Sequence, residues 1–388
     1  MSGQCYNICI MASGFSTAPT RRILDGLDRP DEKLKIIHIA GTNGKGSTAE
    51  FFTQILISAN KRVGTFTSPE VYSFYDQIRI DGKPVTAETY EKYRQRVLPF
   101  AHNASEFEIE TAAAILAFIG EGCEYAVIEC GMGGLNDATN AVSRKELAVI
   151  TSISLEHTAY LGKTLKEICA QKAGIIKDCP AIINAHQPPE VREFFRGYKF
   201  ADKIDEISDG GFVYGGRKFL LSAFGCLQPH NAACAIEGAR LLGIDEEAIY
   251  DGVKNCYPRG RMEKFTAGGR EYVLDGAHNP AAFEPLEEYL CSRGNKRTVI
   301  FGCLSDKDID GNLSRIIADR IIAVPCDSPR SRTTEDIYGH CKREFGRKKV
   351  DRAESVSAAL DMADGETVVV CGSFTLLKEA REWISDLK

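Results

Sequence analysis

The chain has 388 residues, of which 44% are hydrophobic and 26% charged, and its net charge is −6. This length predicts two or three domains, each able to bury a core of its own. The charge excludes the basic footprint of a nucleic-acid-binding protein, and no apolar run reaches the roughly 18–20 residues that a membrane-spanning helix needs. Residues 1–15 lack the basic start and the long apolar core of a signal peptide.

Fourteen cysteines are many for a chain of this length, and they are scattered along it. No Cys-x-x-Cys pair is present, and the nearest approach is Cys5 with Cys9, so zinc-ribbon and thioredoxin-like sites lack support. Cys130, Cys303 and Cys371 stand inside apolar runs of strand type. We therefore expect mostly buried free thiols and a cytoplasmic protein, because the cytosol keeps thiols reduced.

The first predicted element is a short helix at residues 21–27, and residues 36–59 then have the pattern of a strand, a glycine-rich turn and a helix. The turn holds Gly41, Gly44 and Gly46 with Lys45. Such a turn aims backbone N–H groups at a phosphate, and the lysine adds a point charge. Only two residues separate Gly41 from the Gly-Lys pair, whereas the general phosphate-loop pattern has four. We expect a nucleotide here; the alternative is a glycine-rich turn with a solvated lysine.

Apolar strands then alternate with helices as far as residue 242. This alternation favours a largely parallel sheet covered on both faces, where ligands bind beyond the carboxyl ends of the strands. Residues 196–227 are more polar and glycine-rich, which is typical of a small antiparallel piece. The strands and helices expected in this part lie at residues 36–40, 49–57, 63–69, 77–83, 86–98, 108–120, 125–130, 147–153, 181–183 and 230–242.

Residues 257–261 break the pattern, and we expect a domain boundary there. Strands recur near residues 271–275, 297–303, 320–324 and 367–371, which predicts a second α/β domain, Rossmann-like in pattern but without a Gly-x-Gly-x-x-Gly fingerprint. The predicted fold class is therefore α/β. It consists of a phosphate-loop domain with a mostly parallel sheet, over residues 1–259, and a smaller Rossmann-like domain, over residues 260–388.

Three polar side chains follow or end predicted strands of the first domain, namely Ser68, Glu129 and His157. A hydroxyl, a carboxylate and an imidazole are able to complete the shell of a divalent ion beside phosphates, because magnesium keeps waters and takes few protein ligands. The alternatives are a buried Glu129 satisfied by the following glycine turn, and a His157 that caps a helix start.

Four further residues have both a functional and a structural interpretation. Lys172, on a predicted helix, is by itself typical of a solvated surface lysine. Asp275 and His278 crowd the end of a second-domain strand, which favours a site; the alternative is an Asx-turn before a helix. Arg261 lies in the boundary segment and is either a phosphate contact or a linker arginine in solvent.

An ordered set of motifs resembles the folylpolyglutamate synthase and dihydrofolate synthase family, the folate branch of the Mur ligase superfamily. The phosphate loop with shortened spacing, residues 39–48, is the first of them, and the anchors span about residues 21–375. The others lie at residues 67–69, 107–111, 129–134, 137–140, 151–158, 161–162, 172–177, 231–233, 260–263, 274–280, 306–308 and 328–330.

The resemblance implies a role for each matching position. Lys45, Lys172 and His278 would be catalytic, with Lys172 carbamylated. Mg²⁺ would be held by Ser47, Ser68, Glu129 and His157. The acceptor would contact Phe107, Glu108, Asn136, Asp137 and Ala138. ATP would be bound by Asn43, Gly44, Lys45, Gly46, Ser47, Thr48, Asn231, Arg261 and Asp275.

The chemistry implied by the resemblance is amide ligation. ATP would convert a folate or dihydropteroate carboxylate into an acyl phosphate, which the amine of L-glutamate then attacks. Closure of the two domains about a hinge near residues 258–261 would exclude water. The resemblance implies a monomer that acts on small molecules, without nucleic acid or membrane partners.

Departures from the family pattern gather on the acceptor side. They lie at Glu70, at residues 75–77 and at Leu135 with Asn136, while Gln171 replaces a usual glutamate. A second hypothesis is therefore a ligase of this branch that acts on a different carboxylate. A third is an ATP-binding protein without ligase activity, against which the joint presence of Lys45, Glu129, His157, Lys172, Asp275 and His278 argues.

Overall fold

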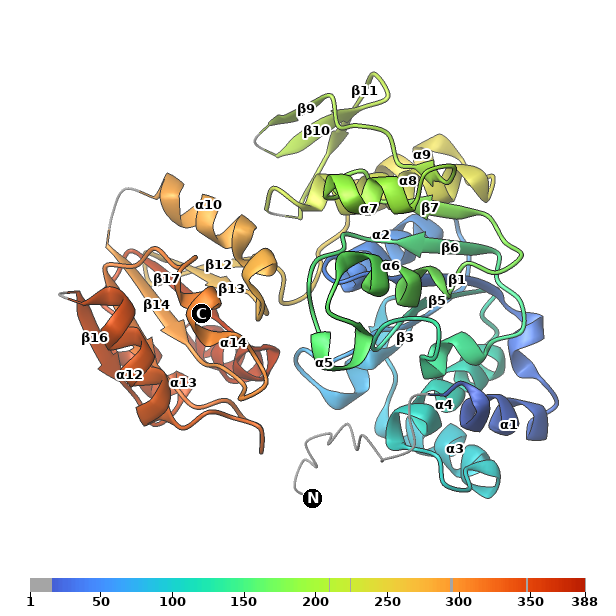
Figure 1. The fold of residues 1–388 in the computed structure, drawn as a ribbon, viewed down its shortest axis with the longest axis horizontal. Helices are drawn as coiled ribbons and strands as arrows, with labels where there is room; N and C mark the ends of the chain where they lie inside the picture. Colours follow the sequence, from blue (N-terminus) through green and yellow to red (C-terminus); the bar gives the residue numbers. More distant parts are fainter. Residues whose placement is uncertain (1–15, 209, 224, 294–295, 347, 388) are drawn as a thin grey trace. The chain divides into compact units, whose positions relative to one another are not determined.

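The computed structural model describes residues 16–208, 210–223, 225–293, 296–346 and 348–387. The expectations about a signal peptide and about Cys5 and Cys9 lie outside these residues. The chain forms two compact units (Figure 1). The first unit contains the described residues up to Glu70 together with Phe74–Ser222 and Leu227–Tyr257, and the second contains Val71–Ser73, Ala223–Cys226 and Pro258–Lys388.

The first unit is built on an eight-stranded sheet with the order β4-β3-β2-β5-β1-β6-β7-β8. Its strands are parallel except at the edge formed by β3 and β4. The central strands are almost wholly buried, as expected for apolar runs covered on both faces. The strands are β1 (Lys35–Ala40), β2 (Val63–Phe66), β3 (Ile78–Ile80), β4 (Lys83–Pro84), β5 (Tyr125–Glu129), β6 (Leu147–Ile150), β7 (Ala181–Ile183) and β8 (Lys199–Phe200).

The helices of this unit include all those expected from the sequence, and α2 packs against α8 and α9. The sequence analysis did not predict α9, whose start is capped by the Asp245 carboxylate. The α-helices are α1 (Ala18–Gly26), α2 (Lys45–Ser58), α3 (Ala87–Val97), α4 (Glu106–Gly120), α5 (Thr158–Leu161), α6 (Leu165–Ala173), α7 (Pro189–Phe194), α8 (Gln228–Leu241) and α9 (Glu246–Lys254). The 3₁₀ helices are η1 (Pro30–Lys33), η2 (Phe74–Gln77), η3 (Leu98–Phe100) and η4 (Ala138–Ala141).

The polar stretch at residues 196–227 contains the expected antiparallel piece. Strands β9 (Glu206–Ser208), β10 (Gly211–Tyr214) and β11 (Arg217–Leu220) form a three-stranded sheet of their own. Phe212 and Phe219 stack across it with ring centroids 5.5 Å apart. The prediction for this stretch is therefore confirmed.

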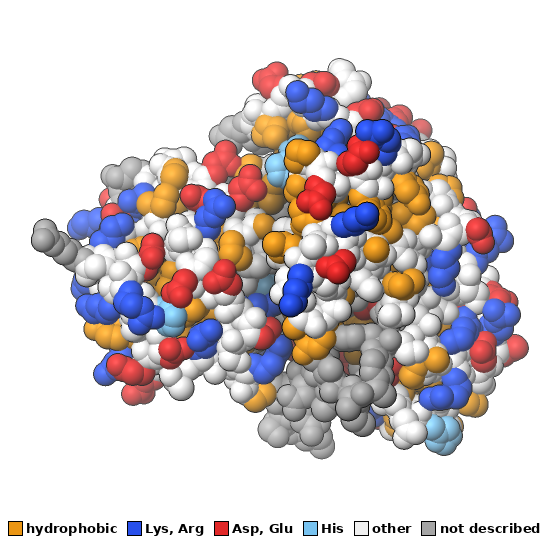
Figure 2. Space-filling model, viewed as in Figure 1, with side chains coloured by type: hydrophobic (Ala, Val, Ile, Leu, Met, Phe, Trp, Pro, Cys, Tyr) orange, Lys and Arg blue, Asp and Glu red, His pale blue; other side chains and the backbone are white. Residues whose placement is uncertain are grey.

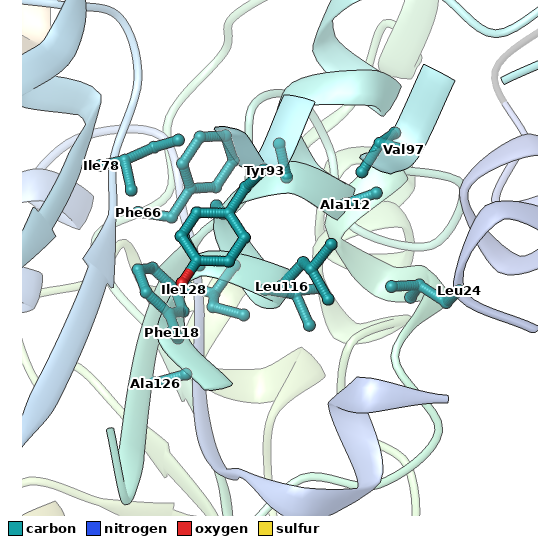
Figure 3. Close-up of a cluster of buried hydrophobic side chains, with 14 of the residues drawn as sticks. Leu24, Phe66, Ile78, Tyr93, Val97, Ala112, Leu116, Phe118, Ala126 and Ile128 are labelled. Carbon is teal, nitrogen blue, oxygen red and sulfur yellow. The ribbon is translucent and has the colours of Figure 1, made fainter. Parts of the chain in front are cut away.

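A large hydrophobic cluster joins α3 and α4 to the sheet. Figure 3 shows Tyr93 of α3 and Phe118 of α4 beside Phe66 of β2 and Ile128 of β5, all of them buried. Helix α4 begins at a capping box in which Ser105 and Glu108 satisfy each other's backbone N–H groups. Its buried apolar face then follows the helical spacing read from the sequence.

The second unit has a six-stranded sheet with the order β12-β13-β17-β14-β15-β16. All neighbours are parallel except β12 and β13. The strands are β12 (Glu263–Ala267), β13 (Arg270–Leu274), β14 (Arg297–Phe301), β15 (Arg320–Ala323), β16 (Lys349–Arg352) and β17 (Thr367–Cys371). The helices are η5 (Pro280–Phe283), α10 (Glu284–Ser292), α11 (Ile309–Leu313), α12 (Thr334–Phe345), α13 (Val356–Met362), η6 (Phe374–Leu376) and α14 (Leu377–Asp386).

The predicted α/β class with mostly parallel sheets is confirmed in both units. Strands β12 and β16 were not predicted, because they lie at the two edges of the sheet and alternate with exposed polar side chains. The described cysteines are free thiols, and most are buried. None of the helices in the described residues is both long enough and apolar enough to cross a membrane. Acidic and basic side chains are interspersed on the face drawn in Figure 2.

Truncation of the cluster in Figure 3 tests this account of the first unit. Phe118 is fully buried, so Phe118→Ala removes transfer energy and leaves a cavity, and should lower the free energy of unfolding by about 3–5 kcal/mol. Leu241→Ala, at an exposed position on α8, should change it by no more than about 0.5 kcal/mol. Urea denaturation followed by circular dichroism measures both, and equal effects would contradict the assignment of this core.

Candidate active site

The loop between β1 and α2 is shaped by two glycines. Gly44 has φ +86° and stands at the N-terminus of α2, and a Cβ atom there would lie 2.3 Å from Asn231 Oδ1. At Gly41 a Cβ atom would lie 1.8 Å from Thr151 Oγ1. Only glycine allows these approaches, so the loop backbone is pressed between β6 and α8 with its N–H groups near a helix start.

The segment after β6 holds the loop through Thr42. The backbone N–H of Thr42 donates to the Ser152 carbonyl at 2.8 Å. The Thr42 hydroxyl donates to the Ser154 carbonyl and accepts from the Ser154 N–H, both at 3.1 Å. The sequence analysis assigned Thr42 no role. A feature of the sequence that could have indicated this role is the hydroxyl of Thr42, one of the two residues between Gly41 and the Gly-Lys pair. In so short a loop, a side-chain hydroxyl is able to make contacts that the backbone does not make.

Lys45, Glu129 and Ser68 come together beside the loop. The Lys45 ammonium donates to the Thr42 carbonyl at 3.1 Å and lies 3.9 Å from Glu129 Oε1. The Ser68 backbone N–H points at Glu129 Oε2 with a separation of 3.4 Å. The Glu129 side chain is almost fully buried. A buried carboxylate between a cation and a serine segment fits the predicted divalent-ion site.

His157 stands at the start of α5 with φ +50°, and its Nε2 lies 3.7 Å from Glu156 Oε1. His157 is the N-cap residue of α5, as the alternative interpretation expected, but its side chain makes no capping hydrogen bond to the helix. Among the described residues, no three His, Cys, Asp or Glu side chains gather as a metal-binding group. The predicted set differs in kind, since two of its four members, Ser47 and Ser68, would bind through hydroxyl oxygens.

Lys172 is only 2% exposed, so its interpretation as a solvated surface lysine is wrong. Its ammonium donates to the Gly41 carbonyl at 2.6 Å, which places it under the phosphate loop. Burial and the positive charge of Lys45, against the opposite pull of Glu156, together lower the pKa of Lys172 to about 8. The local sequence around a single lysine on a helix does not indicate that its side chain is buried.

The start of α8 adds two amide side chains. Gln228 Nε2 lies 3.4 Å from the Ser47 hydroxyl, and Asn231 Nδ2 donates to Gln228 Oε1 at 3.3 Å. Both amides are buried. The structure therefore brings the predicted Asn231 to the loop. Gln228 was not predicted as a site residue, although its spacing of three from Asn231 puts both on one helix face.

The residues predicted for the acceptor lie at the start of α4 and around η4. Phe107 stacks on Phe66 with ring centroids 5.8 Å apart, and a Cβ atom on Gly131 would lie 2.6 Å from its ring. Glu108 accepts from the Ser105 N–H at 2.6 Å, so it acts as a helix cap. Asp137 is buried and caps η4. Of its neighbours in the chain, Asn136 is exposed and Ala138 is buried.

In the second unit, two predicted residues, Arg261 and His278, lie beside Phe374, and Asp275 lies near both of them. The Arg261 guanidinium lies 4.1 Å from the centre of the Phe374 ring, and the His278 ring lies 6.1 Å from it. The Asp275 carboxylate accepts from the backbone N–H groups of Met262, at 2.7 Å, and Ala277, at 2.6 Å. Burial raises the pKa of Asp275, and the nearby Arg261 charge opposes that shift. Phe374 itself was not predicted.

Comparisons with known proteins agree with this arrangement. Residues 39–203 match the Mur ligase middle domain, and residues 260–374 match the Mur ligase glutamate ligase domain. The dihydrofolate synthase/folylpolyglutamate synthase of Bacillus subtilis is 32% identical over 405 residues, which cover 93% of each chain.

Two solved structures extend the likeness to the fold. Escherichia coli FolC in complex with DHPP and ADP superimposes with a TM-score of 0.85 at 27% identity, covering 98% of this chain and 95% of that one. A bifunctional folylpolyglutamate synthase/dihydrofolate synthase with Mn, AMPPNP and L-glutamate bound gives a TM-score of 0.82 at 27% identity, with 96% and 95% covered. The resemblance seen in the sequence is confirmed, and the chain belongs to the dihydrofolate synthase/folylpolyglutamate synthase family of Mur ligases.

Proposed function

We propose that this chain is an ATP-dependent, ADP-forming ligase that joins L-glutamate to the carboxylate of a folate or of dihydropteroate. The observation that carries the proposal is the convergence of Lys45, Glu129 and the buried Lys172 on one glycine loop. The solved relatives described above hold ADP or AMPPNP, and one of them also holds L-glutamate, which supports both substrates.

The phosphates of ATP would be held mainly by the loop. Gly44, just before the start of α2, has no Cβ atom that could block access to the backbone there. Phosphate oxygens would therefore be able to approach the N–H groups at the start of the helix closely. Lys45 would supply positive charge to the transferring γ-phosphoryl group. The residues assigned to ATP in the first unit are Asn43, Gly44, Lys45, Gly46, Ser47, Thr48 and Asn231. Those assigned in the second are Arg261 and Asp275.

A divalent cation, which we assign as Mg²⁺, would be held by Ser47, Ser68, Glu129 and His157. The buried carboxylate of Glu129 and the hydroxyl oxygens are the hard oxygen donors that magnesium prefers. When bound, the ion would neutralise charge on the phosphates. A solved relative has both Mn and AMPPNP bound, which supports the use of a divalent ion together with the nucleotide.

Lys172 is proposed to carry a carbamate. With its pKa lowered to about 8, roughly one amine in ten is neutral at pH 7 and able to attack carbon dioxide. The new N–C bond gives a carboxylate after loss of one proton. This would replace an unfavourable buried ammonium beside Lys45 by an anion that supports the cation or the phosphates.

The reaction follows from these charges. The acceptor carboxylate attacks the γ-phosphorus, ADP leaves, and an acyl phosphate is formed. The glutamate amine then attacks the acyl carbon, and inorganic phosphate leaves with the P–O–C oxygen. The acceptor would lie against Phe107, Glu108, Asn136, Asp137 and Ala138. We assign His278 to the catalytic set with Lys45 and Lys172.

A second candidate is a ligase of the same family with another carboxylate acceptor. It is favoured by Leu135, which exposes 46% of its surface on the turn beside the proposed acceptor residues, and by Asn136, which is also exposed. Glu70, one of the departures from the family pattern, is a carboxyl group whose pKa is raised by burial.

The domain assignment is also a proposal. Residues 1–259 would form the ATP-binding domain, and residues 260–388 the ligase domain. We further propose a cytoplasmic monomer that binds small molecules and neither nucleic acid nor membranes. The free thiols support a reducing compartment, and the interspersed surface charges give no basic patch on the face drawn in Figure 2.

Phosphate release separates the candidates. The purified protein with ATP, Mg²⁺ and glutamate should release phosphate only when dihydropteroate or tetrahydrofolate is added, and mass spectrometry should find the glutamylated product. Release with another carboxylate but with neither pterin would favour the second candidate. Release independent of any acceptor, or none at all, would leave an ATP-binding protein without ligase activity.

Lys45→Ala should reduce kcat by at least ~10²–10³-fold, because a preorganised charge at the phosphates is lost. Steady-state phosphate release measures this, and Lys61→Ala, a change at a lysine of the same unit whose side chain is 38% exposed, is the matched control. A Lys45→Ala rate near that of the control would overturn the assignment of the loop.

Lys172→Arg keeps the charge but forms no carbamate, so kcat should fall by about 10²-fold or more. A short carboxylate such as acetate should restore part of the activity of Lys172→Ala by taking the place of the carbamate. Native mass spectrometry of the protein without substitutions should detect the carbamate adduct. Wild-type activity in Lys172→Arg would refute this role.

A further inference from the structure

A buried hydrogen-bonded chain runs from His38, in the middle of β1, to Asp137 at the start of η4. His38 Nε2 lies 2.8 Å from Thr139 Oγ1 and 3.1 Å from Cys130 Sγ. The Thr139 hydroxyl donates to Asp137 Oδ1 at 2.5 Å. All four residues are at most 4% exposed, so water does not replace any of these contacts. The role proposed above for Asp137 does not account for His38 or Thr139.

The contacts fix which nitrogen of His38 carries the proton. Thr139 has one hydroxyl proton, and Asp137 Oδ1 at 2.5 Å is a closer and stronger acceptor for it than Cys130 Sγ at 3.6 Å, so Thr139 Oγ1 accepts from His38 and Nε2 is the protonated nitrogen. Nδ1 is then a bare acceptor, and it has no hydrogen-bond partner among the described residues. The opposite tautomer would bury an N–H donor without a partner, which is the costlier arrangement.

His38 is also a neutral imidazole. Burial holds its pKa well below the ordinary value, and the positive charges of Lys145 and Lys177 lower it further. The direction of donation is therefore fixed, from imidazole to hydroxyl to carboxylate. Such a series restricts the rotamer of each member, because rotating one side chain would leave a buried polar partner without its hydrogen bond.

The acceptor positions of the Asp137 carboxylate are all occupied by hydrogen bonds from within the protein. Besides the Thr139 hydroxyl, it accepts from the backbone N–H of Thr139 at 3.0 Å, from that of Met132 at 2.8 Å and from that of Gly131. A carboxylate offers about four acceptor positions, and all four are occupied. Asp137 therefore ties the backbone of the glycine turn at residues 131–134 to η4.

That turn supports the proposed acceptor residue Phe107. A Cβ atom on Gly131 would lie 2.6 Å from Phe107 Cζ and 3.4 Å from Asp137 Oδ2, so turn, ring and carboxylate share one contact. Displacement of the Gly131 backbone would displace the ring. The hydrogen bonds described here join His38, Thr139, Cys130, Asp137 and Met132, and none of them involves Gly44, Lys45 or Asn231, which we assigned to ATP.

We propose that His38 is a positioning residue for the acceptor: through Thr139 and Asp137 it fixes the glycine turn, and with it the Phe107 surface against which the acceptor binds. This inference rests on the proposed function. It assigns His38 to acceptor binding although the residue lies on the strand that leads into the phosphate loop.

The first test compares Thr139→Val with Thr139→Ser. Valine keeps the shape but removes the hydroxyl, so the KM for dihydropteroate or tetrahydrofolate should rise about tenfold, while the KM for ATP stays within about twofold. Serine keeps the hydroxyl and should resemble the unmodified chain in both constants. A Thr139→Val variant that raises both KM values equally, or neither, would overturn the proposal.

The second test stands on its own if Thr139→Val does not fold. The amide N–H of His38→Gln reaches the place of the imidazole Nε2–H, whereas that of His38→Asn does not. We expect a near-normal acceptor KM for His38→Gln and a rise of about tenfold for His38→Asn. Where Thr139→Val does fold, adding His38→Asn to it should raise the acceptor KM no further, because the hydrogen-bonded series is already broken. Additive effects, or equal effects of Gln and Asn, would overturn the proposal.

The unmodified chain separates a failed inference from a failed function. If it releases no phosphate with either pterin acceptor, the proposed function fails and the positioning role fails with it. If it does, and the variants keep its acceptor KM, only the role of His38 fails. Thermal unfolding of each variant checks that the compared proteins are folded.

Discussion

The surplus of positive charge under the phosphate loop is the constraint on which the site depends. Lys45 and Lys172 both hydrogen-bond to carbonyls of the loop, and the charge of one lowers the pKa of the other. Glu129 balances part of this charge from 3.9 Å. Glu156 offsets part of the charge of Lys172 as well, and two ammonium groups held close together in a partly dry site still favour an anionic ligand. Nucleotide binding and the proposed carbamate on Lys172 both relieve the same surplus.

The fold builds that site from segments far apart in the sequence. Strand β1 delivers the loop, the segment after β6 holds Thr42, and the start of α8 closes on Gly44 through Asn231. Glycine is required at these approaches, since a Cβ atom would overlap its neighbour. Ser152 and Ser154 hold the shortened loop from outside, through their hydrogen bonds to Thr42.

The sequence predicted the α/β class, most strands and the loop, because buried parallel strands are continuous apolar runs and glycine turns are local. It did not reveal properties that depend on tertiary packing. Lys172 was taken by itself as a surface residue because nothing local indicates burial, and the edge strands β12 and β16 were missed because half their side chains are polar. Glu108 acts as a helix cap, a role that its Ser-x-x-Glu spacing with Ser105 was able to indicate.

The parts proposed to bind ATP and the acceptor share the central sheet, and His38 lies on a strand, β1, that is connected to both. The central claim is that the acceptor carboxylate is activated as an acyl phosphate, and isotope transfer tests it most directly. With dihydropteroate or folate labelled with ¹⁸O in the carboxylate, the account predicts that each turnover moves one ¹⁸O atom into inorganic phosphate. Phosphate without the label, released along with the glutamylated product, would contradict it.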